Sequence, residues 1–163
     1  MSRFKIVGIM ALIAFATGIL LVGNAVAGEK FKWRAEWNTG KPAVFNVPGE
    51  EGQIIGLRED KGILKVLEGS KVMDGMAGVH VGYSEVNTKT GEGVGHGRIL
   101  FTDQDGHKMY WSWEGKGEKG KWSLLMNFLR GTGKFDGFKG KAMVSTTSVS
   151  PNQFYADWEG EME

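Results

Sequence analysis

Apolar and charged residues alternate through residues 30–37, and this segment carries the clearest structural pattern in the chain. Side chains along a β-strand point alternately to its two faces, so the alternation predicts a strand with one buried and one solvated face. After residue 27, no long segment shows the 3.6-residue period of an amphipathic helix. The apolar positions of this first strand are Phe31, Trp33, Ala35 and Trp37.

Shorter strand-like segments follow, separated by turn residues at intervals typical of all-β domains. Residues 40–52 contain two prolines and several glycines and predict irregular chain, whereas the charged residues 58–62 predict a connection between two short strands. Successive strands with short connections pair as neighbours, so we expect an all-β antiparallel meander that closes on itself. The further expected strands are 53–57, 63–67, 77–86, 95–102, 108–113, 122–129, 141–147 and 154–161.

Side-chain parity predicts the register of the hairpin centred near residue 90. Pairing Val81 with Ile99 places the odd-numbered residues of both strands on the buried face. The same register sets Tyr83 opposite Gly97, where an aromatic ring covers the missing side chain. We therefore expect Val81, Ile99 and Tyr83 to point into the barrel.

Extending the odd-numbered face predicts the register of the next hairpin. Pairing Ile99 with Trp111 leaves residues 103–107 as a loop of an allowed hairpin length. Even-numbered residues, His80 and Arg98 among them, are then expected to face solvent.

Residues 1–27 have the composition of a secretory signal peptide. Arg3 and Lys5 precede an apolar run over residues 6–22, and Ala25 and Ala27 form the small-x-small pattern that a signal peptidase accepts. An uncleaved membrane anchor is the alternative, but a spanning helix needs about 20 apolar residues. We therefore expect a single domain over residues 28–163, exported to the periplasm or outside the cell and free of the membrane after cleavage.

Composition excludes several classes of chemistry. The chain has no cysteine, so disulfides, thiolate chemistry and a lipid-modified cysteine are all excluded. Of its 20 Lys and Arg residues, Arg3 and Lys5 belong to the predicted signal, which leaves 18 against 19 acidic residues. These charges are scattered rather than gathered into a basic stripe, and we expect no nucleic-acid partner.

The segment 131–141, GTGKFDGFKGK, resembles the G-x-G-x-[FY]-x-G-x-x-G turn of the allene oxide cyclase and dirigent proteins. Residues 142–147 and 154–160 follow it and are similar to the last strands of those proteins. The resemblance implies an approximately eight-stranded, calycin-like β-barrel. It also implies a family that acts on apolar substrates and often forms dimers or trimers, so a homo-oligomer is one expectation. None of the catalytic residues of those families matches a position here.

Potential metal ligands are present but do not form a convincing site. In the expected register His80 and His96 lie too far apart for one metal, and His107 falls in the next loop. Residues 103–106 resemble the start of a calcium loop, yet the downstream glutamate is missing, and a hairpin turn explains them. We predict neither a metal nor a cofactor.

Aromatic residues on the expected inner face suggest a ligand site. The candidates are Trp33, Trp37, Tyr83, Trp111 and Trp113. An eight-stranded barrel is just wide enough either to be filled by its side chains or to hold one small ligand, and both outcomes stay open here. The sequence therefore predicts binding of an apolar or aromatic small molecule, or a structural role.

The alternative function is that of a cyclase- or isomerase-type enzyme acting on an apolar substrate in the barrel. A buried carboxylate, arginine or tyrosine facing an open cavity would favour the enzyme. A filled interior would favour a structural or interaction protein instead.

The first testable prediction concerns processing. Cleavage after Ala27 is expected, because Ala25 and Ala27 follow directly on the apolar run. N-terminal sequencing of the exported protein should begin at Gly28. Intact Met1 recovered from a membrane fraction would identify an anchor instead.

Overall fold

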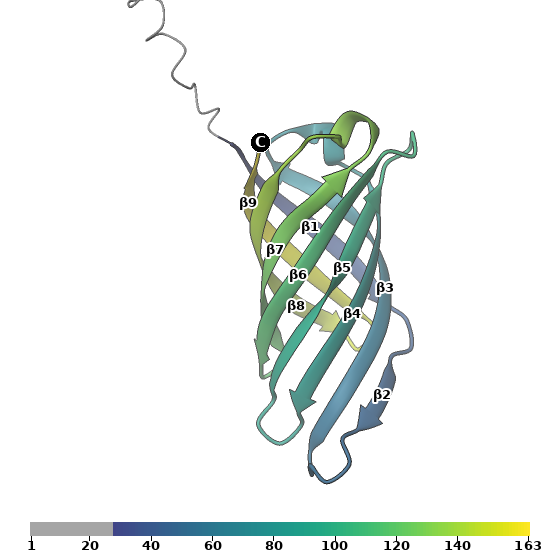
Figure 1. Ribbon diagram of the computed structural model, residues 1–163, viewed down its shortest axis with the longest axis vertical. Helices are drawn as coiled ribbons and strands as arrows, with labels where there is room; N and C mark the ends of the chain where they lie inside the picture. The colour runs from purple at the N-terminus through teal and green to yellow at the C-terminus, as the bar shows by residue number, and fades with distance from the viewer. Residues whose placement is uncertain (1–27) are drawn as a thin grey trace, which may run out of the picture.

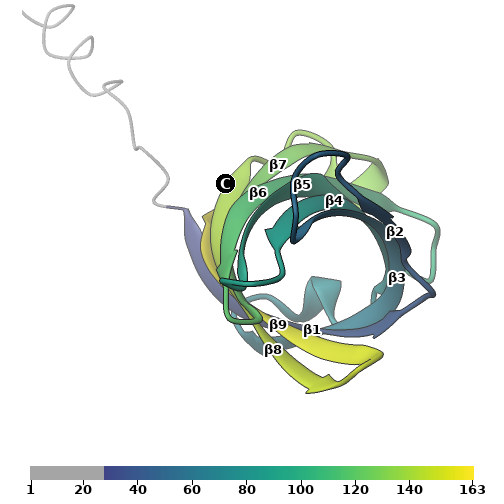
Figure 2. The same cartoon turned by 90° about the horizontal axis from the view of Figure 1, so that it is seen from below.

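The antiparallel strands of this protein pair mostly with their neighbours in sequence and close into a barrel (Figures 1 and 2). The structure is a computed structural model that describes residues 28–163. Strand β1 pairs with β9 on one side and with β3 on the other, so eight strands form the ring, while β2 pairs only with β3 outside it. The expected all-β barrel is confirmed. The strands are β1 (Glu29–Thr39), β2 (Ala43–Asn46), β3 (Gln53–Glu68), β4 (Ala77–Asn87), β5 (Glu92–Thr102), β6 (Lys108–Glu118), β7 (Lys121–Gly131), β8 (Gly140–Ser150) and β9 (Gln153–Met162).

One end of the barrel is closed by two short 3₁₀ turns, η1 (Lys71–Met73) and η2 (Gly133–Phe135), seen at the top of Figure 1. In η2, Phe135 is completely buried and its ring meets that of Phe138 edge-on. Gly133 and Gly137 adopt positive φ angles of 59° and 79°, which favour glycine. The segment 131–141 therefore forms a glycine-dependent turn that folds onto the barrel end, as its sequence predicts.

The middle of the barrel is filled by aromatic side chains. Trp33, Trp111 and Trp158 are each no more than 1% exposed. Their ring centroids lie 5.5–6.1 Å apart, and Trp111 meets both other indoles edge to face. Phe101 adds a further edge contact to Trp158 at 5.8 Å. This packed layer separates the closed end from the open end.

The two hairpin registers predicted from parity have different outcomes. Ile99 pairs with Trp111, so the register of β5 and β6 is confirmed. Between β4 and β5 the prediction is wrong by one residue, because Val81 pairs with Arg98 and Ile99 pairs with His80. The even-numbered residues of β4 therefore point inward. Val81 is 53% exposed, whereas His80 is buried.

The turn between β4 and β5 explains the one-residue shift. The side chain of Asn87 accepts the backbone N–H groups of Lys89 and Thr90 at 2.9 and 3.1 Å. Gly91 completes the turn with a φ of 76°. A local asparagine turn of this kind fixes a loop over residues 88–91, and the loop length fixes the register of the strands that it joins.

Strand β3 runs without interruption through the charged residues 58–62, where a connection between two strands was expected. Arg58 and Asp60 point into the barrel, while Glu59 and Lys61 between them are exposed. The alternation of a strand is therefore kept, although both of its faces carry charge. Strand β2 forms within residues 40–52, where irregular chain was expected.

The loop 103–107 is the hairpin turn that the sequence predicts. Asp103 accepts the backbone N–H groups of Asp105 and His107 and contacts Lys134 Nζ at 2.8 Å. The hydrogen bond from Lys134 is the main cause that lowers the pKa of Asp103. The turn is thus tied to η2 at the closed end.

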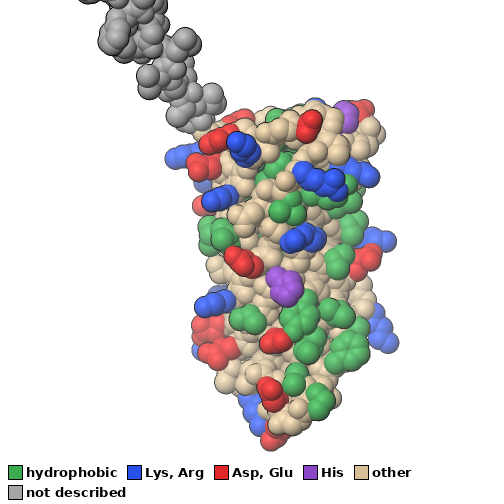
Figure 3. All heavy atoms as spheres, in the orientation of Figure 1, with side chains coloured by type: hydrophobic (Ala, Val, Ile, Leu, Met, Phe, Trp, Pro, Cys, Tyr) green, Lys and Arg blue, Asp and Glu red, His purple; other side chains and the backbone are tan. Residues whose placement is uncertain are grey.

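The outer surface mixes both signs of charge with apolar side chains, which gather towards the lower half of the face in Figure 3. Phe45 and Leu57 are about half exposed, at 55% and 46%. Within residues 28–163, no helix has the length and apolar character needed to span a bilayer. The predicted signal peptide, residues 1–27, lies outside the described residues.

The corrected register predicts that two similar substitutions cause very different losses of unfolding free energy. Ile99→Ala removes a buried side chain and should cost about 2–4 kcal/mol of unfolding free energy through cavity formation. Val81→Ala trims an exposed side chain and should cost less than about 0.5 kcal/mol. Denaturant midpoints of the two variants measure the difference. Equal losses would contradict the register described above.

Candidate ligand cavity

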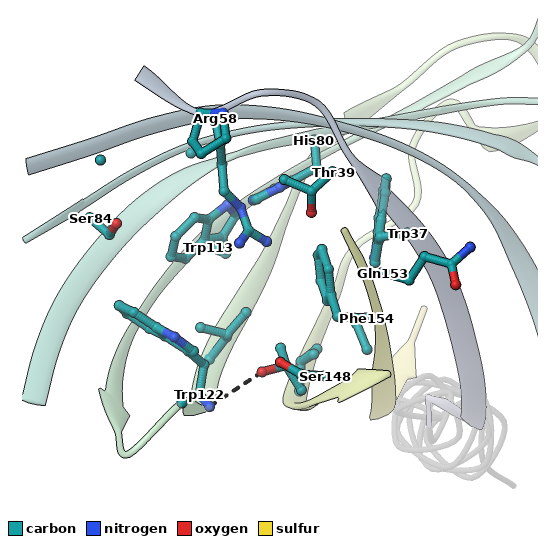
Figure 4. A pocket seen from close by; sticks show the side chains of 18 of the residues that line it. Trp37, Thr39, Arg58, His80, Ser84, Trp113, Trp122, Ser148, Gln153 and Phe154 are labelled. Atoms are coloured by element: carbon teal, nitrogen blue, oxygen red, sulfur yellow. Dashed lines mark hydrogen bonds between the residues drawn. The ribbon is translucent and has the colours of Figure 1, made fainter. Parts of the chain in front are cut away.

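A cavity of about 400 Å³ occupies the open end of the barrel (Figure 4). Its walls come from Trp37, Trp113, Trp122 and Phe154, and its rim includes Pro151 in the turn between β8 and β9. This volume lies within the range of sites for small molecules, which are mostly apolar with a few polar groups. The barrel is therefore filled at its centre and open at one end.

Glycines on the inner face make room for the cavity's tryptophans. A Cβ atom at Gly82 would lie 2.7 Å from the indole of Trp113, and one at Gly97 would lie 2.4 Å from it. Because no Cβ atom tolerates such distances, the ring lies flat on the backbone of two neighbouring strands. Aromatic cover of Gly97 was predicted for Tyr83 and is provided by Trp113. The same arrangement holds for Trp37 over Gly62 and Gly78, and for Trp122 over Gly93 and Gly117.

Three ionisable side chains lie together on the inner face beside the cavity. Asp60 of β3 and His80 of β4 are directly opposite each other in the sheet. Asp60 Oδ2 forms an ion pair with Arg58, whose Nε lies 2.9 Å away, and a hydrogen bond with His80 Nδ1. Asp60 is completely buried, His80 is 6% exposed, and the Arg58 side chain is more open at 38%. Arg58 and His80 line the cavity, and Asp60 lies behind them.

The hydrogen bond to Asp60 fixes the orientation of the His80 ring. When Nδ1 donates to a carboxylate, neutral histidine has Nε2 as its acceptor. A Cβ atom at Gly82 would lie 3.1 Å from both Nε2 and Cε1 of His80, so this edge of the ring lies over a glycine that lines the cavity. Trp37 and Trp113 pack against the ring at centroid distances of 5.8 and 5.3 Å.

Arg58 directs its guanidinium group into the cavity (Figure 4). The group lies 4.6 Å from the centroid of the Phe154 ring, which holds it in a cation–π contact. Its Nε is the atom that contacts Asp60, and the end of the guanidinium group lies at the cavity (Figure 4). Its N–H groups can donate to an acidic or carbonyl group of a ligand.

The structure separates the tryptophans that the sequence predicted as one ligand site. Trp37 and Trp113 line the cavity. Trp33 and Trp111 also point inward, as predicted, but they belong to the packed layer in the middle of the barrel. Ligand binding by any of them stays a prediction.

Tyr83 is among the residues that line the cavity, but its side chain does not point into the barrel, contrary to the prediction. Its ring lies 5.0 Å from that of the exposed His96, and its hydroxyl donates to Glu85 on the outer face. This hydrogen bond is the main cause that raises the pKa of Tyr83. The one-residue shift between β4 and β5 exchanges Tyr83 for His80 as an inward residue.

Sequence reasoning missed all three members of the charged cluster. His80 was expected in solvent, and Arg58 and Asp60 were expected in a connection. The signal that could have found them is the unbroken alternation of β3, in which Arg58, Asp60, Gly62 and Leu64 share one face.

The three histidines lie in separate parts of the barrel. His80 is inside and His96 outside, while His107 is in the closed-end loop. Potential ligand atoms of Asp103, Asp105 and His107 come within 4.8 Å of one another. Asp103 is, however, already bound by Lys134.

Asp60 should contribute to stability more than the carboxylate next to it. Asp60→Ala leaves the buried His80 Nδ1 without its acceptor and should cost about 1–3 kcal/mol. Glu59→Ala is the matched control, because that side chain is 59% exposed and forms a long ion pair with Lys61 at 3.8 Å. Its cost should be below about 0.5 kcal/mol, as for other surface ion pairs. Thermal unfolding of both variants tests the ranking, and a larger loss for Glu59→Ala would contradict it.

Comparison with solved structures shows the same barrel fold. A protein of unknown function from the DUF3224 family of Shewanella oneidensis MR-1 is 15% identical, with a TM-score of 0.51, over 83% of this chain and 98% of that one. A pyocyanin demethylase is 16% identical, with a TM-score of 0.45, over 81% of this chain and 99% of that one. No family model and no curated protein matches the sequence. The comparisons do not confirm the allene oxide cyclase or dirigent family, and the similarity to the DUF3224 protein shows the fold alone.

Proposed function

We propose that this barrel binds a small aromatic molecule in the cavity at its open end. The observation that carries the proposal is the division of the interior, with a packed centre beside an aromatic cavity of about 400 Å³. A barrel with a purely structural role would gain stability by filling this space, since interiors are otherwise closely packed.

The shape of the cavity favours a flat ligand. Trp37, Trp113 and Phe154 present aromatic surfaces, and aromatic pairs prefer stacked or edge-to-face contacts. A planar, conjugated molecule can make such contacts on more than one wall. An aliphatic chain could contact the same walls but could not make stacked or edge-to-face contacts with them.

The ligand should also carry an acidic or strongly accepting group. The guanidinium group of Arg58 points into the cavity, and its planar fork of N–H donors matches the geometry of a carboxylate. An anionic oxygen on the ligand would take the place of the water that these donors otherwise bind. Arg58 would then fix the orientation of the molecule in the cavity.

The sequence supports two further parts of this proposal. Residues 1–27 suggest that the protein acts after export, and the segment 131–141 suggests kinship with barrels that receive apolar substrates. An aromatic acid outside the cytoplasm is the ligand class that these observations favour together.

A pair of fluorescent probes tests the site and its charge preference. Anilinonaphthalene sulfonate is aromatic and anionic, and phenylnaphthylamine is a neutral analogue without the sulfonate. Both should bind saturably, and Arg58→Gln should weaken only the sulfonate, by about tenfold, because it removes one charge-assisted contact. Fluorescence titration measures both affinities.

A neighbouring pair of variants locates the binding. Ser148 lines the cavity on β8, and Thr147 beside it is exposed on the outer face. Ser148→Trp should abolish binding of both probes by filling the cavity, and Thr147→Trp should leave it unchanged. Binding that survives Ser148→Trp would place the probes elsewhere and contradict the proposal.

A further inference from the structure

We infer that the cavity is also a proton-transfer site, in which His80 acts as general base on the bound aromatic molecule. This inference rests on the proposed binding function and goes beyond it, from a binding protein to an isomerase. Its substrate class is a conjugated carbon acid whose conjugate base is an oxyanion, such as an enolisable aromatic carbonyl compound.

The orientation of His80 is the first argument. Asp60 binds Nδ1 from behind, so the lone pair of Nε2 lies on the ring edge that passes over Gly82, at the cavity wall. No hydrogen bond among the described residues involves Nε2. A buried carboxylate behind a histidine whose other nitrogen is free fixes the tautomer that a general base needs.

The position of Arg58 is the second argument. Arg58 Nε forms an ion pair with the same Asp60 oxygen that His80 Nδ1 contacts, so the two side chains converge on one point of the wall. A substrate beside them can therefore have its carbon at His80 and its oxygen at Arg58. Charge that develops on this oxygen is stabilised by the preformed cation of Arg58.

The third argument is that the charged cluster contributes little to the stability of the fold. Asp60 is completely buried, and its Oδ1 has no hydrogen-bond partner among the described residues. Replacing a buried ionic group by well-packed apolar residues is often neutral or stabilising. A chemical role accounts for charged residues at this place in an otherwise apolar interior.

The proposed step is balanced without a co-reactant. Nε2 of His80 takes a proton from carbon, the C–H electron pair forms a carbon–carbon double bond, and the carbonyl π pair moves to the oxygen at Arg58. The protonated His80 then returns the proton to another carbon of the conjugated system while the carbonyl re-forms. The net reaction is an isomerisation. His80 is the catalytic residue, and Asp60 is a positioning residue.

The base-promoted ring opening of 5-nitrobenzisoxazole tests this step without knowledge of the natural substrate. Removal of the C–H proton forms the nitrile as the N–O bond breaks, and its electron pair goes to a coloured phenoxide. The wild-type protein should show saturable turnover, inhibited competitively by anilinonaphthalene sulfonate. His80→Gln should lower kcat/KM by about 100-fold, while His96→Gln, at the exposed histidine of β5, should leave it unchanged.

Asp60→Asn separates positioning from a structural role. Asparagine is nearly isosteric but can donate to Nδ1 and so favour the opposite tautomer, and kcat should fall by about tenfold or more with little change in KM. The pH profile of kcat/KM should change with it, because Arg58 and Asp60 are the charged groups that face His80 among the described residues. Phenylnaphthylamine binding reports whether each variant keeps its folded cavity.

The outcomes distinguish the two proposals. Turnover that depends on His80 and is blocked by the sulfonate supports proton transfer. Probe binding without turnover, or equal rates in the wild type and His80→Gln, overturns the proton-transfer inference and leaves the binding function standing. Absence of probe binding would overturn the binding function, and the inference with it.

Discussion

An eight-stranded barrel encloses a limited interior volume, and the division of that volume between side chains and open space determines the rest of this structure. The indoles of Trp33, Trp111 and Trp158 fill the centre, where each is no more than 1% exposed. Towards the open end, glycines take several inward positions of β4 and β5, so Trp113 lies flat against the wall instead of crossing the lumen. Glycines at these positions, where other residues would project side chains into the lumen, leave room for the cavity.

The buried charge of Asp60 is acceptable only because its neighbours compensate for it. A carboxylate removed from water loses several kcal/mol of hydration free energy, and partners with good geometry must offset that loss. Arg58 and His80 do so from two directions. The same ion pair and hydrogen bond orient Arg58 and His80 toward the cavity, so the contacts that make Asp60 tolerable also arrange the polar groups that a ligand would meet.

The sequence predicts the fold well but the site only partly, and two local features explain the difference. Alternation identifies β1 and its inward tryptophans because one face of this strand is wholly apolar. In β3 both faces carry charge around Asp60, so the same alternation resembles a polar turn. In β4 valines occupy the exposed face, and the buried face holds His80 between Gly78 and Gly82. Hydrophobicity therefore indicates the wrong face, and only the asparagine turn at Asn87 shows the true register.

The charged cluster lies at the level where the closed barrel wall ends. The residues of β3 from Asp60 to Glu68 pair with β1, and the residues from Ile54 to Leu57 pair with β2. Arg58 therefore lies in the interval where β1 has left the ring and β2 has not yet joined. Asp60 is at the last fully enclosed level and is completely buried, whereas the Arg58 side chain, one level further out, is 38% exposed. Because the exchange of strand partners opens the wall here, a ligand entering from the open end would meet Arg58 before it reached His80.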